Sequence, residues 1–549
     1  MKQIESNSQA KTPWSEQRYE AGTSSYARIY TAVHEGVRGQ LVRIEISLSP
    51  GLPYFDIAGM KANAAAAVRS RIRAAIRNSG FDFPKRRITA SFSPEVRRQN
   101  CRELDLPLTL CLLQADGQLA LPMHCAALGE VALSGDILPD RDFYNLLSCL
   151  SEYAARSELS LIFTAAFAEA LQPRFKACVF PVSSLADAAK FLRAGLSSAQ
   201  LKQEAGRRLN LIKITPPPAL PPRPAVSYIE GQSQALAALV IAAAGRHHLI
   251  IKGGPGCGKS FLISLLPYLL PELTEPQLHL LRCIYAAGSQ PVPELVGAGY
   301  PPLRQPHYRI SAAALLGGGV PVLPGEITLA QHGILFLDEL NEFKPGILDL
   351  LRLPLSEGVI RLARANQKIV FPADFLLVGA SNPCPCGQLY EPGSTCGCSD
   401  REIARFNAKL SAPIRDRVDL EVILHRIPAG QLSQTVQHQA TVDLAVLQQQ
   451  VKQARHLQQM RYQAYDHPEW LNSNVPADVI KQVFEVTASA MKLAQQFALS
   501  AQLSVRGFQK LLRVARTQAD LRACPLVENA DIALAAQFKI TESGSPELP

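Results

Sequence analysis

The sequence predicts an α/β protein of several domains, in which a doubly wound parallel sheet is followed by a helical domain. Three observations support this fold class. Short apolar segments at residues 248–253, 333–339 and 374–382 alternate with helical patterns, as do the central strands of a parallel sheet covered on both faces. From about residue 430 the apolar residues recur at helical spacing. A proline-rich stretch at residues 214–228 favours an extended linker ahead of this region.

Composition limits the class of protein further. A chain of 549 residues is too long for one hydrophobic core. Its longest apolar run, at residues 235–245, is shorter than the roughly 20 residues that a membrane span needs, and its polar start does not resemble a signal peptide. Most of the twelve cysteines lie singly in apolar runs, which is typical of a reducing compartment. We therefore expect a cytoplasmic protein with no membrane partner, and the net charge of +9 permits nucleic-acid binding without requiring it.

The first part of the chain has a mixed α/β pattern. Residues 41–48 and 86–93 alternate like strands, and residues 61–80 form a helical pattern that ends at Gly80, a residue suited to a helix C-terminus. A basic stripe lies beside the apolar face of this helix: Arg69, Arg73 and Arg77. The stripe is either a solvated helix face or a nucleic-acid contact.

Two helices are expected in the C-terminal part. One contains Leu444, Leu447, Val451 and Ala454 at helical spacing. A final helix is expected over residues 503–521, with Ser504 as its N-cap.

A P-loop is the strongest motif in the sequence. Gly253-x4-Gly258-Lys259-Ser260 follows an apolar strand and opens a helix, which is the context that this motif requires. Backbone N–H groups of such a loop surround phosphate oxygens, the lysine reaches the β- and γ-phosphates, and the serine ligates Mg²⁺. The residues expected to bind ATP are Gly253, Gly254, Pro255, Gly256, Cys257, Gly258, Lys259, Ser260 and Phe261.

Polar residues end the next two apolar strands. Asp338 and Glu339 follow residues 333–337, where Asp338 is expected to hold Mg²⁺ and Glu339 to polarise the attacking water. Asn382 ends the following strand and is placed to sense the γ-phosphate. An Asp-Glu pair or an asparagine at a strand end is otherwise an ordinary loop feature, but the preceding P-loop favours the catalytic interpretation.

Two arginines complete the predicted catalytic set. Arg417 is expected to reach the nucleotide of a neighbouring subunit, with Arg415 as the second choice, although a surface Arg–Asp pair is the alternative. Arg506 lies in the first turn of a helix, where the helix dipole does not favour a cation, so a phosphate partner would explain it. One P-loop with an arginine supplied by a neighbour implies a ring.

Four cysteines follow the asparagine strand closely. Cys384, Cys386, Cys396 and Cys398 have the spacing C-x-C-x9-C-x-C in a polar loop. Two thiolate pairs can form a closed structural Zn²⁺ site, and a metal would offset the ordering entropy of a loop without a core. Unliganded thiols and a redox pair remain as alternatives.

Five motifs together resemble one family: "GGPGCGKS", "PGEITLAQHGILFLDEL", "SNPCPCG", "SAPIRDRVDL" and "LSVRGFQKLLRVARTQADL". They are similar to motifs of the ComM/YifB family of magnesium-chelatase-like AAA+ ATPases. The similarity extends into the first part of the chain through "SLSPGLPYFDIAG" and "LDLPLTLCLLQADG", so it covers residues 27–538.

The resemblance implies a domain plan and a role for each site residue. It implies a noncatalytic Lon-protease-like domain of the S5-type α/β fold at 27–213, a AAA+ core at 227–429 and a helical lid at 430–549. Composition adds a disordered polar tail at 1–26 and the proline-rich linker at 214–226. Lys259 and Ser260 would belong to Walker A, Asp338 and Glu339 to Walker B, Asn382 to sensor 1, Arg417 to the arginine finger and Arg506 to sensor 2.

The family further implies a hexameric motor that drives branch migration of DNA during natural transformation, with recombination proteins as possible partners. Residues 358–375 would contain the pre-sensor hairpin, with Arg361, Arg364 and Lys368 contacting DNA phosphates. The alternatives are a solvated hairpin and, for the whole protein, a chaperone-like ATPase that remodels a protein partner, as the chelatase I subunit does.

The sequence departs from the family pattern at three places, two of them in the first domain. Where Lon-type proteases carry a serine nucleophile, the comparable stretch at 101–105 is Cys-Arg-Glu-Leu-Asp, so peptide hydrolysis is not expected. "RRQNCRE" replaces the usual Lys-Glu-Gly, and Asn341 stands where proline is common.

Overall fold

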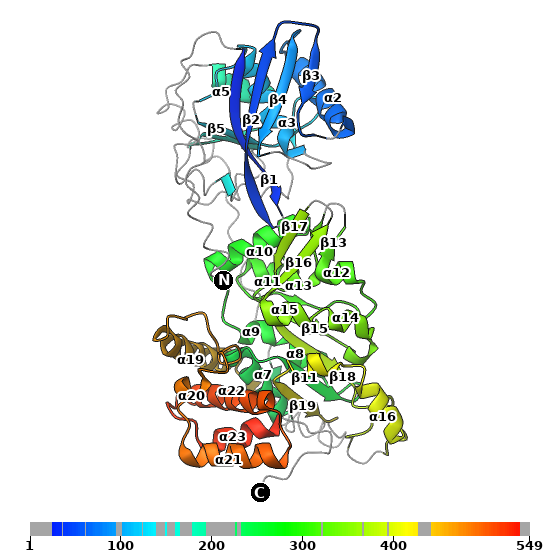
Figure 1. Ribbon diagram of the computed structural model, residues 1–549, viewed down its shortest axis with the longest axis vertical. Coiled ribbons are helices and arrows are strands. Elements are labelled where there is room, and N and C mark those ends of the chain that lie inside the picture. Colours follow the sequence, from blue (N-terminus) through cyan, green and yellow to red (C-terminus); the bar gives the residue numbers. More distant parts are fainter. Residues whose placement is uncertain are drawn as a thin grey trace. The chain divides into compact units, whose positions relative to one another are not determined.

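The structure is a computed structural model, and the chain divides into two compact units (Figure 1). One unit is formed by residues 1–33 and 39–214, and the other by residues 34–38 and 215–549. The predicted tail up to residue 24 and the linker up to residue 225 lie outside the described residues. The structure describes residues 25–35, 37–60, 62–94, 102–122, 124–138, 146, 149–150, 160–164, 178–193, 226–227, 232–319, 322–364, 367–391, 395–426 and 441–538.

The first unit is built on a seven-stranded mixed sheet. Its strands, in sheet order, are β3 (Tyr54–Ile57), β4 (Arg87–Ser93), β2 (Arg38–Ser49), β1 (Tyr26–Glu35), β5 (Cys125–Leu128), β8 (Ser160–Thr164) and β9 (Cys178–Val182). Strands β2 and β4 are antiparallel, whereas β5, β8 and β9 run parallel. The unit also contains α2 (Ala62–Asn78), η1 (Arg102–Leu104), α3 (Asp105–Ala115), α5 (Leu185–Arg193) and the antiparallel pair β6 (Glu130–Val131) and β7 (Ile137–Leu138).

Helix α2 confirms the predicted apolar face, because Val68, Ile72 and Ile76 are buried in the core of this unit. The chain leaves the helix through Gly80, whose φ of +79° is the left-handed conformation that glycine adopts without strain.

Two arginines of the basic stripe on α2 make contacts within their own unit. The Nη1 atom of Arg69 donates to the carbonyl of Phe55 at 2.8 Å. The guanidinium of Arg73 lies 4.8 Å from the ring centroid of Phe83. These contacts give both side chains a structural role that needs no nucleic acid.

The second unit contains the predicted parallel sheet. Its strands, in sheet order, are β12 (Leu303–Arg304), β15 (Ile334–Leu337), β18 (Leu376–Ser381), β11 (Leu249–Gly253) and β19 (Leu420–Leu424). Every neighbouring pair is parallel. The residues of β15 and β18 are all buried, which agrees with the unbroken apolar runs from which these strands were predicted.

Short helices and strand pairs surround this sheet. The helices are α7 (Ser233–Gly245), α8 (Lys259–Ser264), α9 (Leu266–Leu269), α10 (Glu275–Ala287), α11 (Glu294–Gly297), α12 (Ala312–Leu316), α13 (Glu326–Leu329), η3 (Leu340–Glu342), α14 (Pro345–Asp349), α15 (Arg352–Glu357), α16 (Asp400–Asn407) and α17 (Ala412–Arg415). The strand pairs, all antiparallel, are β10 (Val226–Ser227) with β20 (Thr441–Val442), β13 (Gly317–Gly318) with β14 (Leu323–Pro324), and β16 (Val359–Arg364) with β17 (Gln367–Pro372).

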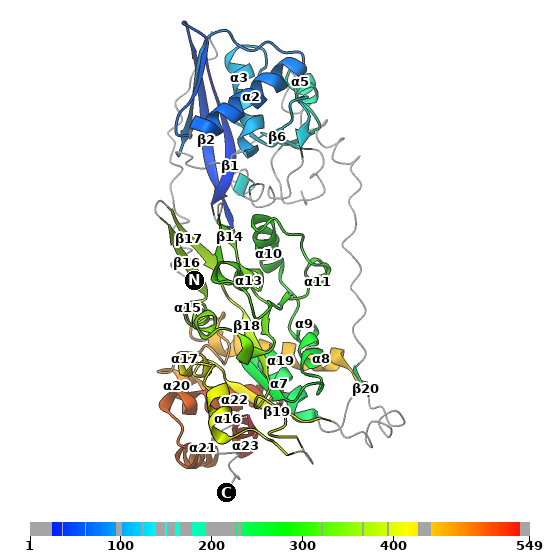
Figure 2. The same cartoon turned by 90° about the vertical axis from the view of Figure 1, so that its right-hand side faces the viewer.

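The C-terminal part is helical, as predicted. It contains α19 (Leu444–Gln463), α20 (Ile480–Val483), α21 (Ala488–Ser500), α22 (Val505–Leu521) and α23 (Asn529–Gln537). Ser504 is the N-cap of α22, since its hydroxyl accepts from the N–H of Gly507 at 3.1 Å. The expectation that this helix is the last one is wrong: α23 follows it and buries Ile532 and Ala535. Figure 2 shows the C-terminal helices gathered beside the sheet of this unit.

A buried polar network joins these helices to the sheet. His247 lies in the short loop between α7 and β11, and its Nδ1 atom lies 3.1 Å from the Oδ2 atom of Asp419. Its Nε2 atom lies 2.8 Å from the hydroxyl of Thr517 on α22. Asn472 also donates to the Thr517 hydroxyl, at 2.9 Å. These hydrogen bonds form together only when α22 lies in this position against the sheet, so the network holds the helix there.

Asp520 is the centre of charge in this network. Its buried carboxylate receives hydrogen bonds from Arg461, from Arg516 at 2.9 Å and from Asn472 at 2.9 Å. Arg516 is buried as well. A pair of arginines without this carboxylate would leave uncompensated charge in the interior.

In the described part of the chain, no helix is both long and apolar enough to span a bilayer.

We predict that Asp520→Ala destabilises the second unit by roughly 3–5 kcal/mol, because it leaves two guanidinium groups without the carboxylate that compensates their charge. Thermal unfolding followed by circular dichroism should show a transition several degrees lower than in the parent chain. Asp478→Ala, at an exposed position of the same helical part, is the matched control and should leave the transition unchanged. Equal transitions for the two variants would contradict this assignment.

Candidate nucleotide-binding site

The P-loop connects β11 to α8. Gly256 and Gly258 have φ values of +78° and +91°, which side chains rarely adopt, so the loop requires glycine at both positions. The Nζ atom of Lys259 donates to the carbonyls of Gly253 at 2.6 Å and Gly254 at 2.9 Å. The ammonium group therefore lies over the loop, where phosphate oxygens would meet its three donors.

Two hydrogen bonds connect the P-loop to the neighbouring strands. Lys259 donates to the Oδ1 atom of Asn382, just beyond β18, at 3.3 Å. The hydroxyl of Ser260 donates to the Oδ2 atom of Asp338, just beyond β15, at 3.2 Å. The structure thus brings together four of the predicted site residues. A hydroxyl beside a carboxylate is an oxygen-ligand pair of the kind that Mg²⁺ prefers, so Ser260 and Asp338 could hold the ion.

Glu339 is exposed beside this pair. Its φ of +51° is unusual for a residue with a side chain, and its N–H donates to the Oδ1 atom of Asp338 at 2.9 Å. Strained backbone of this kind gathers at functional sites. Sequence reasoning missed Gln305, whose amide donates to the Oδ2 atom of Asp338 at 3.4 Å. Gln305 follows the two-residue strand β12, which is too short to give a recognisable pattern.

Arg417 lies among other arginines. Its guanidinium donates to the hydroxyl of Ser356 at 2.6 and 3.0 Å. Partial burial, followed by the nearby positive charges of Arg352 and Arg506, lowers the pKa of Arg417. Arg506 is exposed and lies 4.0 Å from a carboxylate oxygen of Asp416. The predicted finger and sensor-2 arginines thus lie close enough to interact, on a surface rich in positive charge.

Arg415, the second choice for the finger, is placed differently. Its Nη2 atom donates to the carbonyls of Asn407 at 3.2 Å and Leu410 at 3.1 Å. These bonds hold the end of α16 against α17, which is a structural role.

The hairpin of β16 and β17 contains the predicted DNA-contacting residues. Arg361 is exposed and forms an ion pair with Glu357, the last residue of α15, four positions earlier in the sequence. Such surface pairs contribute little stability, so this guanidinium can change partner at low cost. The side chains of Arg364 and Lys368 lie outside the described part of the structure.

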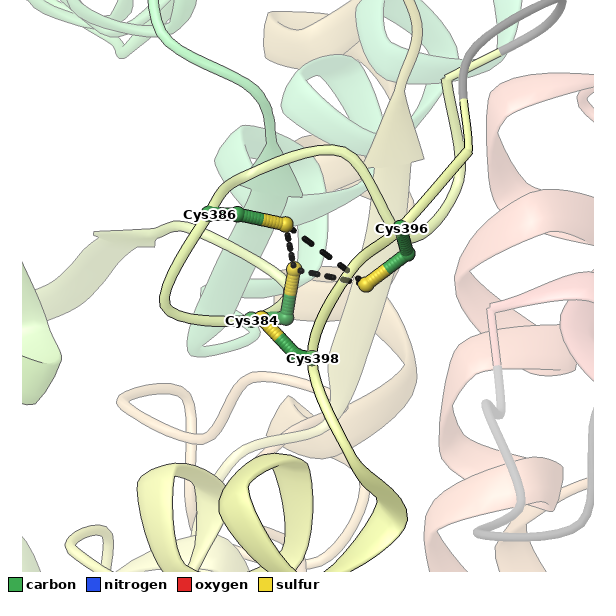
Figure 3. Close-up of side chains that lie close together, drawn as sticks. All are labelled: Cys384, Cys386, Cys396 and Cys398. Atoms are coloured by element: carbon green, nitrogen blue, oxygen red, sulfur yellow. Dashed lines mark hydrogen bonds between the residues drawn. The ribbon is translucent and has the colours of Figure 1, made fainter.

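Figure 3 shows the four cysteines of the loop after β18 pointing toward one another. The sulfur of Cys384 lies 3.3 Å from that of Cys386 and 3.6 Å from that of Cys396, and all four sulfur atoms lie within 4.8 Å of one another. The N–H of Gln388, together with the Cys384 thiol, lowers the pKa of Cys386 to about 6. Four thiols that converge in this way could hold a metal ion.

The sheet and its edge define a class of protein. A parallel sheet with a P-loop after β11, an Asp-Glu pair after β15 and an asparagine after β18, followed by a helical domain, is the arrangement of a P-loop ATPase of the AAA+ type. Family models agree with this class. They are described as "Magnesium chelatase, subunit ChlI" for residues 225–432, "Subunit ChlI of Mg-chelatase" for residues 44–159 and "Magnesium chelatase, subunit ChlI C-terminal" for residues 442–539.

Similar proteins narrow the class to a family. The competence protein ComM of Haemophilus influenzae is 33% identical over 515 residues, which cover 91% of this chain and 94% of that protein. The protein YifB of Salmonella typhimurium is 32% identical over 527 residues, covering 94% and 97% of the two chains. The magnesium-chelatase 38 kDa subunit of Cereibacter sphaeroides is 30% identical over 179 residues, covering 29% and 52%. The chain belongs to the ComM/YifB family of magnesium-chelatase-like proteins, and this membership indicates an ATPase that uses ATP and Mg²⁺.

We predict that Ser260→Ala removes the dependence of nucleotide binding on Mg²⁺, because it removes the hydroxyl placed beside Asp338. Titration with a fluorescent ADP analogue should show affinity in Mg²⁺ reduced by about tenfold, equivalent to about 1.4 kcal/mol. Ser264→Ala, one turn further along, is the control, since the Ser264 hydroxyl donates only to the local carbonyl of Phe261 among the described contacts. An Mg²⁺ effect that survives in Ser260→Ala would contradict this role.

Proposed function

We propose that the protein is an ATP-driven DNA motor that acts as a hexameric ring in branch migration or strand remodelling during recombination of incoming DNA. The observation that supports the proposal is the pair of hydrogen bonds that connect Lys259 to Asn382 and Ser260 to Asp338 at one edge of the sheet. In addition, Arg417 lies close enough to Arg506 for their positive charges to interact. Similarity to a competence protein supports a role with DNA.

The side chains at the sheet edge divide the work of hydrolysis. Lys259 would neutralise the β- and γ-phosphates, and Ser260 and Asp338 would hold Mg²⁺, which stabilises negative charge on the transferred phosphoryl group. Glu339, exposed next to Asp338, would orient and deprotonate the attacking water. The amide of Asn382, already within hydrogen-bond distance of Lys259, would report whether a γ-phosphate is present.

The arginines provide the argument for a ring. Arg417 and Arg506 share a surface with Arg352, and like charges so placed are stabilised by an anion. The γ-phosphate of ATP bound to a neighbouring subunit is such an anion, and an arginine supplied in trans raises hydrolysis by stabilising the transition state.

We predict that Arg417→Ala and Lys259→Ala are each nearly inactive, but that mixing them restores measurable ATP hydrolysis. A ring of both variants contains sites in which an intact P-loop faces an intact Arg417. Mixing Arg417→Ala with a Lys259→Ala/Arg417→Ala double variant is the control and should restore nothing. If the first mixture is as inactive as its components, although native mass spectrometry shows mixed rings, Arg417 does not act in trans.

The β16–β17 hairpin is the proposed DNA contact. Basic side chains on a hairpin bind phosphates without reading base sequence, which suits a motor that moves along DNA. The proposal places Arg361, Arg364 and Lys368 at this contact.

We predict that the triple substitution of Arg361, Arg364 and Lys368 by alanine removes the stimulation of ATP hydrolysis by DNA. Hydrolysis is measured with single-stranded, duplex and four-way-junction DNA, and turnover without DNA is the internal reference. A control triple substitution, Arg401→Ala/Arg405→Ala/Lys481→Ala, removes the same charge at exposed positions elsewhere and should retain the stimulation. Stimulation that survives the hairpin variant would exclude the hairpin as the DNA contact.

A second candidate is a chelatase-like ATPase that remodels a protein partner. The family models matching residues 225–432 and 442–539, both named after the chelatase subunit ChlI, favour it. The same assay separates the two candidates, because hydrolysis indifferent to every DNA would support the protein-remodelling activity.

The four cysteines are proposed to hold a structural Zn²⁺ ion. Tetrahedral Zn²⁺ with four thiolates, at Zn–S bonds of about 2.3 Å, requires sulfur atoms about 3.8 Å apart. The observed separations of 3.3, 3.5 and 3.6 Å among three of the sulfurs fit this geometry with small adjustments. A site closed by four protein ligands leaves no position for substrate, so the ion would be structural.

The first unit is proposed to be a noncatalytic Lon-like domain. Asp105 lies in the stretch that replaces a serine nucleophile, and its carboxylate receives two hydrogen bonds from Arg71 at 2.8 and 2.9 Å. Burial outweighs this pairing and raises the pKa of Asp105 to about 6. An aspartate engaged in this way serves the packing of α3 against α2.

A further inference from the structure

The loop that contains the four cysteines, residues 384–398 and here called the cysteine loop, lies directly against the P-loop. A Cβ atom at Gly387 would come within 2.9 Å of the Cδ atom of Pro255. A Cβ atom at Gly254 would lie 3.0 Å from the carbonyl oxygen of Gly387. The two backbones therefore touch at positions where both loops carry glycine, and neither can move far without displacing the other.

A second connection runs through Glu391 and Arg426. Glu391 belongs to the cysteine loop, and one carboxylate oxygen accepts from the N–H of Arg426 at 3.2 Å. The guanidinium of Arg426, which follows β19, donates to the carbonyl of Pro255 at 2.9 Å. The other carboxylate oxygen of Glu391 would lie 2.5 Å from a Cβ atom at Gly254. Glu391 and Arg426 thus connect the cysteine loop, the end of β19 and the P-loop.

The cysteine loop has little apolar packing of its own. Among the four cysteines only Cys384 is buried, whereas Cys386 is exposed and Cys396 and Cys398 are partly exposed. A segment that buries so little apolar surface does not repay the entropy of its own ordering. The convergence of the four sulfur atoms is then a further constraint on the position of the loop, beside the contacts of Gly387 and Glu391, and a metal bound there would supply ordering energy.

We propose that occupancy of the four-cysteine site sets the geometry of the P-loop, with Gly387, Glu391 and Arg426 as the positioning residues that transmit it. This inference rests on the metal site proposed above and adds a consequence for the nucleotide. With the site occupied, the cysteine loop holds Gly254 and Pro255 in place and the P-loop is preorganised for phosphate. When the site is empty, nucleotide binding must also order the P-loop, so affinity falls.

Coupling between two sites is reciprocal. If bound metal raises the affinity for nucleotide by some factor, bound nucleotide raises the affinity for metal by the same factor. The equality of the two factors can be tested by measuring binding alone, without measuring ATP hydrolysis.

The first experiment measures both affinities on the full chain. Zinc content is determined by elemental analysis, and a zinc-selective chelator then removes the ion. A chelator is preferred to a mercurial reagent, because a mercurial would also attack Cys257 inside the P-loop. We expect the dissociation constant of a fluorescent ADP analogue to rise by about fivefold or more when zinc is removed, and to recover when Zn²⁺ is restored. We also expect the affinity for zinc to be higher by the same factor when ADP is bound.

The second experiment tests the contacts themselves. Gly387→Ala should keep zinc but weaken ADP binding, because its methyl group would press against Pro255 and its φ of +76° disfavours a side chain. Gly397→Ala is the matched control in the same loop, since a Cβ atom there would meet nothing within 4 Å. Arg426→Met should weaken ADP binding similarly, whereas Arg401→Met, at an exposed position of α16, should not.

The outcomes separate this inference from the proposals on which it rests. A chain that binds no zinc would contradict the metal site and, with it, this inference, but not the ATPase. Zinc that binds and is removed without changing ADP affinity would overturn the inference alone. The inference is supported if ADP affinity depends on zinc and is weakened by Gly387→Ala and Arg426→Met, but is unchanged by the controls Gly397→Ala and Arg401→Met.

Discussion

The parallel register of β11, β15 and β18 is the constraint on which the rest of the second unit depends. Leu249 of β11 pairs with Val378 of β18, and Leu337 of β15 pairs with Gly379. Because the three strands run in one direction, the residues that follow them meet at one edge of the sheet. Lys259 consequently reaches Asn382, although 123 positions separate them in the sequence. Binding of Mg²⁺ and of a nucleotide requires these side chains to lie close together, and the parallel sheet brings them to the same place.

The same sheet determines where the helical domain sits. His247, just ahead of β11, contacts Thr517 on α22, and the first turn of α22 carries Arg506. One helix therefore contains both the polar connection to the sheet and an arginine of the charged surface. Burying hydrogen-bonded polar groups costs stability compared with apolar packing, but it permits fewer arrangements.

Strand adjacency also explains why the cysteines lie near the nucleotide site. The cysteine loop leaves β18, and the P-loop leaves the neighbouring strand β11 at the same edge. Two loops from adjacent parallel strands occupy adjacent volumes, and here small residues, Gly254 and Gly387, allow their backbones to touch. A structural metal site would elsewhere stabilise only its own loop. In this position a bound metal would, on our proposal, also constrain the phosphate-binding backbone.

The sequence by itself determined the elements whose signal is local. The P-loop, the strands within the apolar segments 333–339 and 374–382 and the cap at Ser504 were all predicted, because spacing, apolar runs and capping depend on neighbouring residues. Tertiary structure alone decided the contacts of Gln305 with Asp338 and of Arg426 with Pro255, and the buried network around Asp520. Apart from the pair Arg516–Asp520, which lies within one turn of α22, these contacts join residues distant in sequence, where no periodicity links the partners. Their identity depends on strand order and on how the helices pack, and a linear pattern contains neither.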